Sequence, residues 1–254
     1  MNYPCRILRT GFENAYFNMG LDEAVLDSVA SGASLPTLRF YGWKPRAISL
    51  GYFQGIRDEI DIEACHGHGV DIVRRITGGG AVFHDAELTY SIVIPEGHPL
   101  APLSILDSYG LLCAGIIEGL KELGIKSEFS PINDIVSGGK KISGNAQTRK
   151  KGCLLQHGTV LIKVDVDEMF ALLKVPKEKA LGKMIADVKE RVTSLSDILR
   201  SEIAFEDVAA AMEKGFARAL DLDGLEDSPT QAETAKAKEL AETKFSTKEW
   251  IFKR

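Results

Sequence analysis

The chain has 254 residues, of which 44% are hydrophobic and 26% are charged, and its net charge is −5. This composition is typical of a globular protein with one substantial core, and the slight acidity excludes proteins that bind nucleic acid through a basic surface. The N-terminal residues lack the apolar segment of a signal peptide, and no apolar run is long enough to span a membrane. We therefore expect a cytoplasmic protein with no nucleic-acid partner and no membrane partner.

The first part of the chain alternates between helical and strand patterns. Apolar residues spaced three and four apart predict a helix over 17–29, with Asn18 as its N-cap. Strands are predicted at 38–41, 47–50 and 70–73, and a short helix at 60–66. A strand at 89–94 and an amphipathic helix at 105–123, capped by Ser104, follow.

The second part carries three short strand patterns, at 134–136, 140–143 and 159–162, and then becomes helical. Gly138 and Gly139, between the first two strands, predict a hairpin. Helices are predicted at 167–175, 205–220 and 231–244. Because strands and helices do not follow a strict strand–helix–strand rhythm, we expect an α+β fold with mixed or mostly antiparallel sheets flanked by helices.

A glycine-rich segment lies between two of the predicted strands. Residues 74–85 read Arg-Arg-Ile-Thr-Gly-Gly-Gly-Ala-Val-Phe-His-Asp. Three successive glycines let a ligand approach the backbone closely, with amide groups directed at its oxygen atoms. Arg74 and Arg75 are fixed cations that suit phosphate or carboxylate. The alternative is a hairpin turn whose flanking charges face water.

A second polar cluster follows further along the chain. Asn133 and Asp134 begin a predicted strand, and the next strand contains Lys140 and Lys141. Side chains alternate along a strand, so only one of the two lysines can line a site. A glycine loop and a strand lysine together would suit a carboxylate beside a polyanion, as carboxylate adenylation requires. The alternative is a pair of solvated lysines. No P-loop sequence is present.

The cysteines give weak signals. Cys5, Cys65, Cys113 and Cys153 lack the CxxC spacing of a zinc site and are expected to be free thiols. Cys65 lies beside two histidines, but three adjacent ligands without a partner cluster are a poor indication of a metal.

The glycine loop, Asn133-Asp134 and the sequence Lys141-x-Ser-Gly-x-Ala together resemble the lipoate–protein ligase A family, and the resemblance extends over about 18–194. It implies the class II biotin/lipoyl synthetase-like fold that this family shares with biotin ligases and octanoyltransferases. We accordingly expect a catalytic domain at residues 1–200 and a helical C-terminal extension at 201–254 packed on the same domain.

The resemblance implies a two-step ligase reaction. Lipoate and ATP, with Mg²⁺, would form lipoyl-AMP, and the lipoyl group would then pass to a lysine of an acceptor lipoyl domain. The acceptors implied are the E2 component of 2-oxoacid dehydrogenases and the glycine cleavage H protein. Few residues follow the matched region, which resembles split ligases, so we also expect a small accessory ligase subunit.

The resemblance also assigns residues to the site. Lys141 matches the catalytic lysine of the family, and Asp134 is expected to bind Mg²⁺ through the phosphates. The positions expected to bind ATP and lipoyl-AMP are Arg75, Gly78, Gly79, Gly80, Ala81, Val82, Phe83, Asn133, Asp134 and Lys141. The positions expected in the lipoate pocket are Tyr41, Gly51, Arg74, Gly78, Gly79, His84, Gly144 and His157.

Two segments, 86–90 and 147–152, instead resemble the octanoyltransferase branch, whose members need no ATP and form a thioester on a cysteine. The two places where that cysteine is expected hold Ser130-Pro131-Ile132-Asn133 and Lys174-Val175-Pro176-Lys177. Cys153 is the only thiol near the predicted site. We therefore expect the ligase, with octanoyl or lipoyl transfer through a cysteine thioester as the alternative. Biotin ligation and an inactive binding module are further alternatives.

Overall fold

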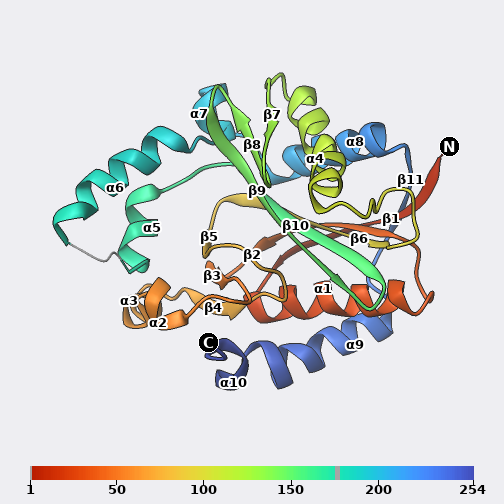
Figure 1. Ribbon diagram of the computed structural model, residues 1–254, viewed down its shortest axis with the longest axis horizontal. Helices are drawn as coiled ribbons and strands as arrows, with labels where there is room; N and C mark the ends of the chain where they lie inside the picture. The colour runs from red at the N-terminus through yellow and green to blue at the C-terminus, as the bar shows by residue number, and fades with distance from the viewer. Residues whose placement is uncertain (1, 175–177) are drawn as a thin grey trace.

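A large mixed sheet forms the centre of the computed structural model, which describes residues 2–174 and 178–254 (Figure 1). Its strand order is β11-β1-β2-β6-β10-β9-β8-β7. The strands are β1 (Tyr3–Glu13), β2 (Thr37–Trp43), β6 (Glu87–Pro95), β7 (Glu128–Ser130), β8 (Asp134–Ser137), β9 (Lys140–Lys150), β10 (Cys153–Leu161) and β11 (Leu222–Asp227). β1 is parallel to β2 and β11, and the other neighbours are antiparallel. The expected α+β fold with mostly antiparallel sheets is confirmed.

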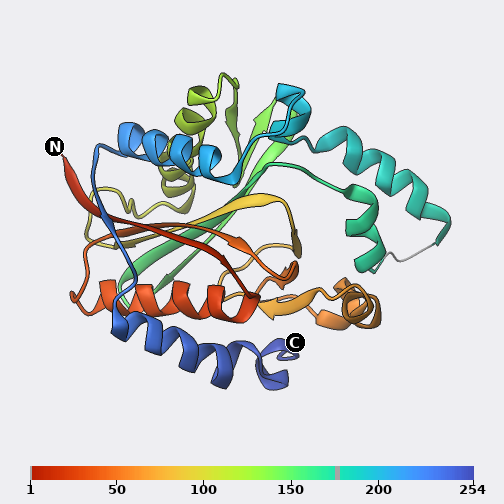
Figure 2. The same ribbon diagram turned by 180° about the vertical axis from the view of Figure 1, so that it is seen from behind.

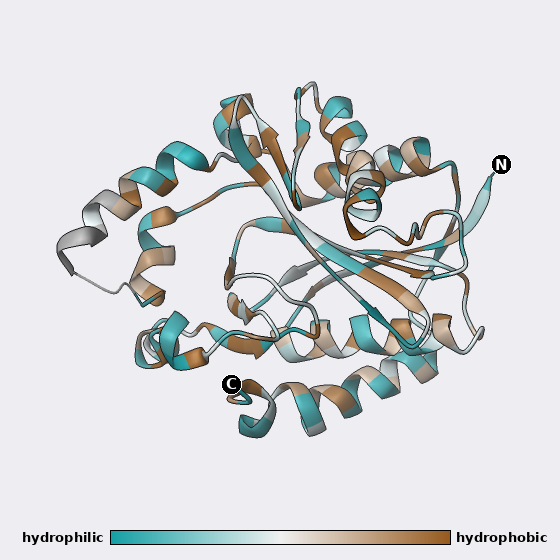
Figure 3. Cartoon of the chain, viewed as in Figure 1, coloured by the Kyte–Doolittle hydropathy of each residue, from teal (hydrophilic) through white to brown (hydrophobic). Residues whose placement is uncertain are grey.

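Helices cover both faces of this sheet (Figures 1 and 2). On one face, α4 (Ile105–Glu122) packs against α8 (Phe205–Leu220), and a Cβ on Gly215 would lie 2.2 Å from the backbone nitrogen of Gly119. On the other face, α1 (Ala15–Ala30) is covered by α9 (Gln231–Leu240). Hydrophobic and hydrophilic segments alternate along α4 and α9 in Figure 3, as expected for helices that bury one side. Two separate hydrophobic cores therefore lie on either side of the sheet.

A smaller sheet lies beside the large one and has the order β4-β3-β5. Its strands are β3 (Ala47–Leu50), β4 (Asp71–Arg74) and β5 (Val82–His84). A third hydrophobic core joins this sheet to α2 (Ile56–Glu59), α3 (Ile62–Gly67), α5 (Val166–Leu172) and α10 (Lys248–Ile251). The glycine loop connects β4 to β5, so the small sheet fixes both ends of it.

The C-terminal region returns to the N-terminal part of the fold. After α6 (Glu178–Arg191), α7 (Leu195–Leu199) and α8, strand β11 extends the large sheet beside β1. Arg6 of β1 is buried and binds Asp227 of β11 and Glu233 of α9. The π-helical turn η1 (Ala241–Phe245) then leads to α10. The division into a catalytic domain at residues 1–200 and a helical extension at 201–254 packed on the same domain stays a prediction.

Several predicted elements differ from the observed ones. The N-cap of α1 is Asn14, whose side chain accepts from Phe17 N, while Asn18 lies inside the helix and donates to Gly42 O. β9 and β10 form a longer hairpin than predicted, because Lys151 and Gly152 make its turn with positive φ. The strand β11 and the helix α6 were not predicted, and the predicted end of the helix over 167–175 lies outside the described residues.

The predicted helices at 105–123 and 205–220 are confirmed almost to the residue, and so is Ser104 as the cap of the first. Within the described residues, no helix is both long and apolar enough to cross a membrane.

Candidate active site

The glycine loop is held by close backbone contact with the small sheet. Gly79 has a φ of +96°, a conformation that favours glycine. A Cβ on Gly51 would lie 2.0 Å from the Gly79 carbonyl oxygen, so Gly51 must lack a side chain for the loop to pass. Gly51 therefore contacts the backbone of the loop and does not line the pocket.

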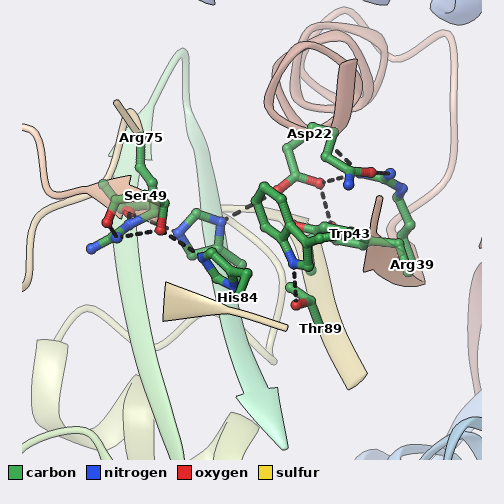
Figure 4. Close-up of polar contacts among 12 residues, drawn as sticks. Asp22, Arg39, Trp43, Ser49, Arg75, His84 and Thr89 are labelled. Carbon is green, nitrogen blue, oxygen red and sulfur yellow. Dashed lines mark hydrogen bonds and ion pairs between the residues drawn. The ribbon is translucent and has the colours of Figure 1, made fainter. Parts of the chain in front are cut away.

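Arg75 binds both the glycine loop and Ser49, and Figure 4 shows it beside Ser49. Its guanidinium donates to Gly78 O (3.0 Å), Gly80 O (2.9 Å) and Ser49 Oγ (2.7 Å). Burial lowers the pKa of Arg75 to about 10, which still leaves it charged at neutral pH. No carboxylate in the described part of the chain pairs with Arg75, so its charge is suited to a ligand oxygen that carries negative charge.

Lys141 approaches the same space from β9. Its Nζ lies 2.7 Å from Asp134 Oδ1 on β8, and the two side chains are 41% and 34% exposed. A Cβ on Gly144 would lie 2.7 Å from that Nζ, so the absence of a side chain there leaves room for the ammonium group. Lys141 lines the pocket, whereas Lys140 is exposed.

A pocket of about 300 Å³ lies between the glycine loop, β9, β10 and the end of α6. Its polar lining residues are Ser49, Arg75, His84, Thr89, Asn133, Lys141, Asn145, His157 and Thr159. Its large apolar and aromatic lining residues are Met19, Tyr41, Trp43, Val82, Phe83, Leu161, Val164, Met169, Val188 and Val192. An apolar cavity with a few converging polar groups is typical of a site for a small ligand.

A buried polar network centred on Asp22 of α1 supports the pocket. Asp22 accepts hydrogen bonds from Arg39 Nη1 (2.9 Å) and Tyr41 OH (3.0 Å), and His157 Nδ1 lies 3.3 Å away. Burial alone raises the pKa of Asp22, but the hydrogen bond with His157 and the charge of Arg39 lower it below its ordinary value. His157 Nε2 in turn lies 2.7 Å from Thr77 Oγ1. The network therefore positions the start of the glycine loop.

His84 belongs to a second buried group of polar side chains (Figure 4). Its Nε2 lies 2.6 Å from Ser49 Oγ, its Nδ1 lies 2.7 Å from Glu87 Oε1, and its ring stacks on Trp43 with centroids 4.0 Å apart. Burial lowers the pKa of His84, and the opposing effect of Glu87 is smaller. His84 is therefore neutral at pH 7. Trp43 Nε1 donates to Thr89 Oγ1 at 2.8 Å.

The structure brings together most of the residues that the sequence assigned to the site. Those that line the pocket are Tyr41, Arg75, Gly79, Gly80, Ala81, Val82, Phe83, His84, Asn133, Lys141, Gly144 and His157. Gly51, Gly78 and Asp134 contact these residues without lining the pocket. The roles of all these residues in binding or catalysis stay predictions.

Arg74 lies elsewhere. Its guanidinium is buried and donates to the backbone carbonyls of Gly51, Gln54 and Ile251. Side chains alternate along β4, so Arg74 points away from Arg75 and toward the C-terminal segment. It fastens that segment to the small sheet instead of contributing to the expected lipoate pocket.

Sequence reasoning missed several lining residues. Met19 and Ser49 come from elements that were predicted, and Trp43 lies two residues beyond the strand predicted at 38–41. Nothing in the sequence indicated that these elements meet at one pocket. Val188 and Val192 are spaced four residues apart, and this helical spacing was the available signal for a wall built by α6.

Asp134, which was expected to bind Mg²⁺ through the phosphates of a nucleotide, forms an ion pair with Lys141. Within the described residues, no group of three or more His, Cys, Asp or Glu side chains could hold a metal ion by itself. The role of Asp134 toward Mg²⁺ stays a prediction.

Comparison with known proteins agrees with the resemblance. The pattern of the lipoyl protein ligase A/B catalytic domain matches residues 14–217. Octanoyltransferase LipM of Geobacillus kaustophilus is 38% identical over 98% of this chain and 98% of its own. Octanoyltransferase LipM of Staphylococcus aureus is 36% identical and covers 100% of both chains.

Solved structures show the same fold. A structure from the lipoylation system of Thermoplasma acidophilum, described as a bi-partite lipoate protein ligase and its E2 lipoyl domain, has a TM-score of 0.87 and 32% identity over 99% of this chain and 96% of its own. A lipoate-protein ligase A bound with ATP has a TM-score of 0.83 and 31% identity over 99% of both chains. The T. acidophilum protein Ta0514 with bound lipoic acid has a TM-score of 0.81 and 30% identity over 99% of this chain and 100% of its own.

These comparisons correct one expectation. The prediction of an ATP-dependent lipoate–protein ligase is wrong, because curated relatives that match the chain over its whole length are named octanoyltransferases. The prediction gave too much weight to the missing cysteine at the expected positions. The transferase alternative, which segments 86–90 and 147–152 had indicated, agrees better with these relatives.

Proposed function

Because the chain belongs to the lipoyl protein ligase A/B catalytic domain family, we propose that it is an acyltransferase that moves an octanoyl group onto a lysine of a lipoyl domain. The donor would be an octanoyl thioester on a carrier, so the carbonyl carbon is already activated and adenylation is not needed. The acceptors proposed are lipoyl domains of the E2 and H-protein type, since a similar structure comes from an archaeal lipoylation system described as a bi-partite lipoate protein ligase and its E2 lipoyl domain.

The pocket is the observation that carries this proposal. Its apolar wall, which includes Met19, Leu161 and Val192, suits a medium-length acyl chain, and a volume of about 300 Å³ fits one small ligand. Lys141 and Arg75 bring positive charge to the same pocket. Charge of this sign stabilises the oxyanion that develops on a carbonyl under attack.

The surrounding residues would hold these two cations in place. Asp134 orients Lys141 through its ion pair, and Ser49 and the loop carbonyls orient Arg75. Such preorganisation matters because the catalytic benefit depends on the charges being in position before the reaction begins. The accessory subunit was expected for an adenylation step, and the proposed transfer does not require it.

The test is acyl transfer without nucleotide. The protein is incubated with an octanoylated acyl-carrier protein and a lipoyl domain, with no ATP present, and the lipoyl domain is analysed by intact mass. We expect a lipoyl domain heavier by one octanoyl group, with the label on its acceptor lysine. A lipoyl domain with that lysine changed to alanine is the matched control.

Two results would contradict the proposal. One is no transfer from the thioester donor under any condition. The other is modification that appears only when a free fatty acid and ATP are supplied together, because a transferase has no use for adenylation.

A further inference from the structure

An exposed surface of aromatic rings and cations lies next to the glycine loop, outside the pocket. It combines the segment after β3, the turn between β9 and β10, and the C-terminal segment, and we call it the cationic patch. Its residues are Tyr52, Phe53, Lys150, Trp250, Lys253 and Arg254. The three cations are exposed, and Phe53 is 73% exposed. None of these six residues lines the pocket.

The aromatic rings hold the cations together. Lys253 Nζ donates to Tyr52 OH at 2.9 Å and lies 4.9 Å from the ring centroids of both Tyr52 and Trp250. Lys150 Nζ lies 5.3 Å from the centroid of the same Tyr52 ring. A cation at such a distance over an aromatic face is attracted by the ring. The charges of two distant segments are therefore gathered around one tyrosine.

Lys150 lacks the carboxylate partner that its neighbours in the sequence have. Arg149 lies 3.8 Å from Glu96, and Lys151 is paired with Asp27. In the part of the chain that the structure describes, no carboxylate side chain lies within ion-pair distance of Lys150, which contacts the tyrosine ring instead. The charge that this turn leaves unpaired is therefore the one that faces the patch.

The C-terminal segment adds further positive charge. Among the described residues, no ion pair joins Lys253 or Arg254 to a carboxylate side chain. The buried guanidinium of Arg74 lies beneath them and donates to backbone carbonyls, including that of Tyr52. The hydrogen bond from Lys253 and the charges of Lys253, Lys150 and Arg254 lower the pKa of Tyr52. A protein with a net charge of −5 thus has one local region of positive potential.

This patch borders the glycine loop directly. Tyr52 N donates to Thr77 O at 2.8 Å, and a Cβ on Gly78 would lie 3.9 Å from Phe53 Cδ2. On β9, Lys150 follows the pocket residue Ala146 by four positions, which places it on the same face of the strand about 13 Å away. A molecule bound to the patch would therefore lie beside the pocket without filling it.

We propose that the cationic patch binds the carrier protein that delivers the octanoyl thioester, through acidic side chains of that carrier. This inference rests on the proposed function. Opposite charges on two partners speed their encounter and fix their relative orientation. The aromatic rings supply the kind of contact surface in which protein interfaces are enriched. The patch thus recognises the carrier, whereas the pocket recognises the acyl group.

The distance between patch and pocket favours the donor over the acceptor. A lysine side chain has only a four-carbon stem, so a lipoyl domain must lie directly at the pocket mouth to present its acceptor amine. A carrier protein holds its thioester on a long flexible arm. Its body can bind to one side while the arm crosses the glycine loop into the pocket. The position of Lys150, about 13 Å along the strand from Ala146, suits this second arrangement.

Charge reversal tests the patch, with Lys150→Glu and Lys253→Glu combined in one variant. Initial rates are measured with two donors: an acidic octanoylated acyl-carrier protein, and octanoyl-pantetheine, which has the thioester arm but no protein. We expect KM for the octanoylated carrier to rise about tenfold, because like charges now face each other. The ratio of kcat/KM between the two donors should fall by a similar factor, and KM for the lipoyl domain should stay the same.

The control carries two matched changes elsewhere, Lys126→Glu and Lys214→Glu. Both lysines are exposed; Lys126 precedes β7 and Lys214 belongs to α8, at the opposite end of the molecule from α10 (Figures 1 and 2). This variant has the same net charge as the patch variant and should keep the KM of the unmodified protein. Added salt should slow transfer from the carrier in the unmodified protein more than in the patch variant, because salt screens exposed charges.

Each outcome bears on one proposal. The same KM for the octanoylated carrier in the patch variant and the control would overturn the docking role while leaving the transferase intact. A rise in KM for the lipoyl domain alone would assign the patch to the acceptor and overturn its assignment to the donor. An equal loss with octanoyl-pantetheine would show an effect on the pocket and not on docking. No transfer from either thioester by the unmodified protein would overturn the transferase, and the docking role with it.

Discussion

Lys141 carries the sharpest prediction at the scale of single residues. Changing Lys141 to alanine should lower kcat/KM for octanoyl transfer by roughly 10²–10³-fold, the usual cost of removing one group that stabilises an oxyanion. The melting temperature should hardly change, because the Lys141 side chain is 41% exposed and its ion pair with Asp134 is solvated. Activity and thermal unfolding are measured on the same samples.

Lys140→Ala is the control for this variant, since Lys140 is the exposed neighbour on the other side of the strand. It should leave kcat/KM within the error of the unmodified protein. Near-normal transfer by Lys141→Ala would contradict the role assigned to this lysine, and an equal loss in both variants would point to a general effect of surface charge.

The buried imidazole of His84 makes stability depend on pH. Its pKa is lowered below 6.5 by burial, so the unfolded chain binds a proton more readily than the folded one. The contribution of His84 to the free energy of unfolding is therefore fully present above about pH 6.5, the pKa in the unfolded chain. It is lost as the pH falls toward the lower pKa of the folded state, and the free energy of unfolding changes by at most about 1.4 kcal/mol per pH unit. Urea unfolding of the unmodified protein and His84→Gln, compared between pH 7.5 and 5, checks this.

The comparison isolates His84 from His98, whose pKa burial also lowers and which is present in both proteins. We expect His84→Gln to be less stable at pH 7.5, because contacts to Ser49 and Glu87 are weakened, but to lose less stability on acidification. Identical pH slopes in the two proteins would show that His84 does not titrate differently in the folded state.

At the scale of elements, the glycine loop depends on the space beside Gly51. Gly51→Ala should lower the free energy of unfolding by about 1–3 kcal/mol, because the new Cβ would lie 2.0 Å from the Gly79 carbonyl and the backbone must move. Gly80→Ala is the matched control, since nothing lies within 4 Å of its Cβ position. Urea midpoints are compared. Equal destabilisation by both changes would mean that alanine in the loop region, and not the close contact, is responsible.

Local sequence patterns predicted the elements that depend on local physics. The apolar spacing in α4 and α8 directly encodes the face that each helix buries, so their bounds could be read closely. The start of α1 was misplaced because Asn14 and Asn18 both suit an N-cap. Only the tertiary contacts of Asn18 with Gly42 and Arg39 explain why it lies inside the helix. The polar strand β11 gave no such signal, because its pairing with β1 joins distant parts of the chain.

The sequence likewise predicted some residues of the candidate site and missed others. Residues of one continuous motif, such as Arg75 and His84, were found because neighbouring residues in the sequence stay close in the fold. Met19 and Val188 could not be found, because they reach the pocket only through the packing of α1 and α6. Arg74 was misassigned because a charge beside a glycine loop suggests a ligand, whereas its partners are carbonyls of the C-terminal segment.

At the scale of the whole molecule, the C-terminal region closes the fold. β11 pairs with β1 from Leu222 to Asp227, and a Cβ on Gly20 of α1 would lie 2.5 Å from the Ala237 carbonyl oxygen of α9. Four large apolar side chains of this region are buried: Leu222, Leu240, Phe245 and Ile251. We therefore expect the region to be needed for folding, although it follows the segment that the family pattern matches.

A chain that ends at Asp221 tests this expectation. Loss of the four buried apolar side chains should lower the free energy of unfolding by roughly 6–12 kcal/mol, at about 1.5–3 kcal/mol each. The free energy of unfolding of a whole domain is only about 5–15 kcal/mol. The truncation also leaves β1 as an unpaired edge that can associate with other chains. We expect aggregation or a broad, non-cooperative urea transition by circular dichroism. Removing only the exposed Lys253 and Arg254 should preserve a cooperative transition. A cooperative transition with a near-normal midpoint in the shorter chain would show that residues 222–254 are a dispensable extension.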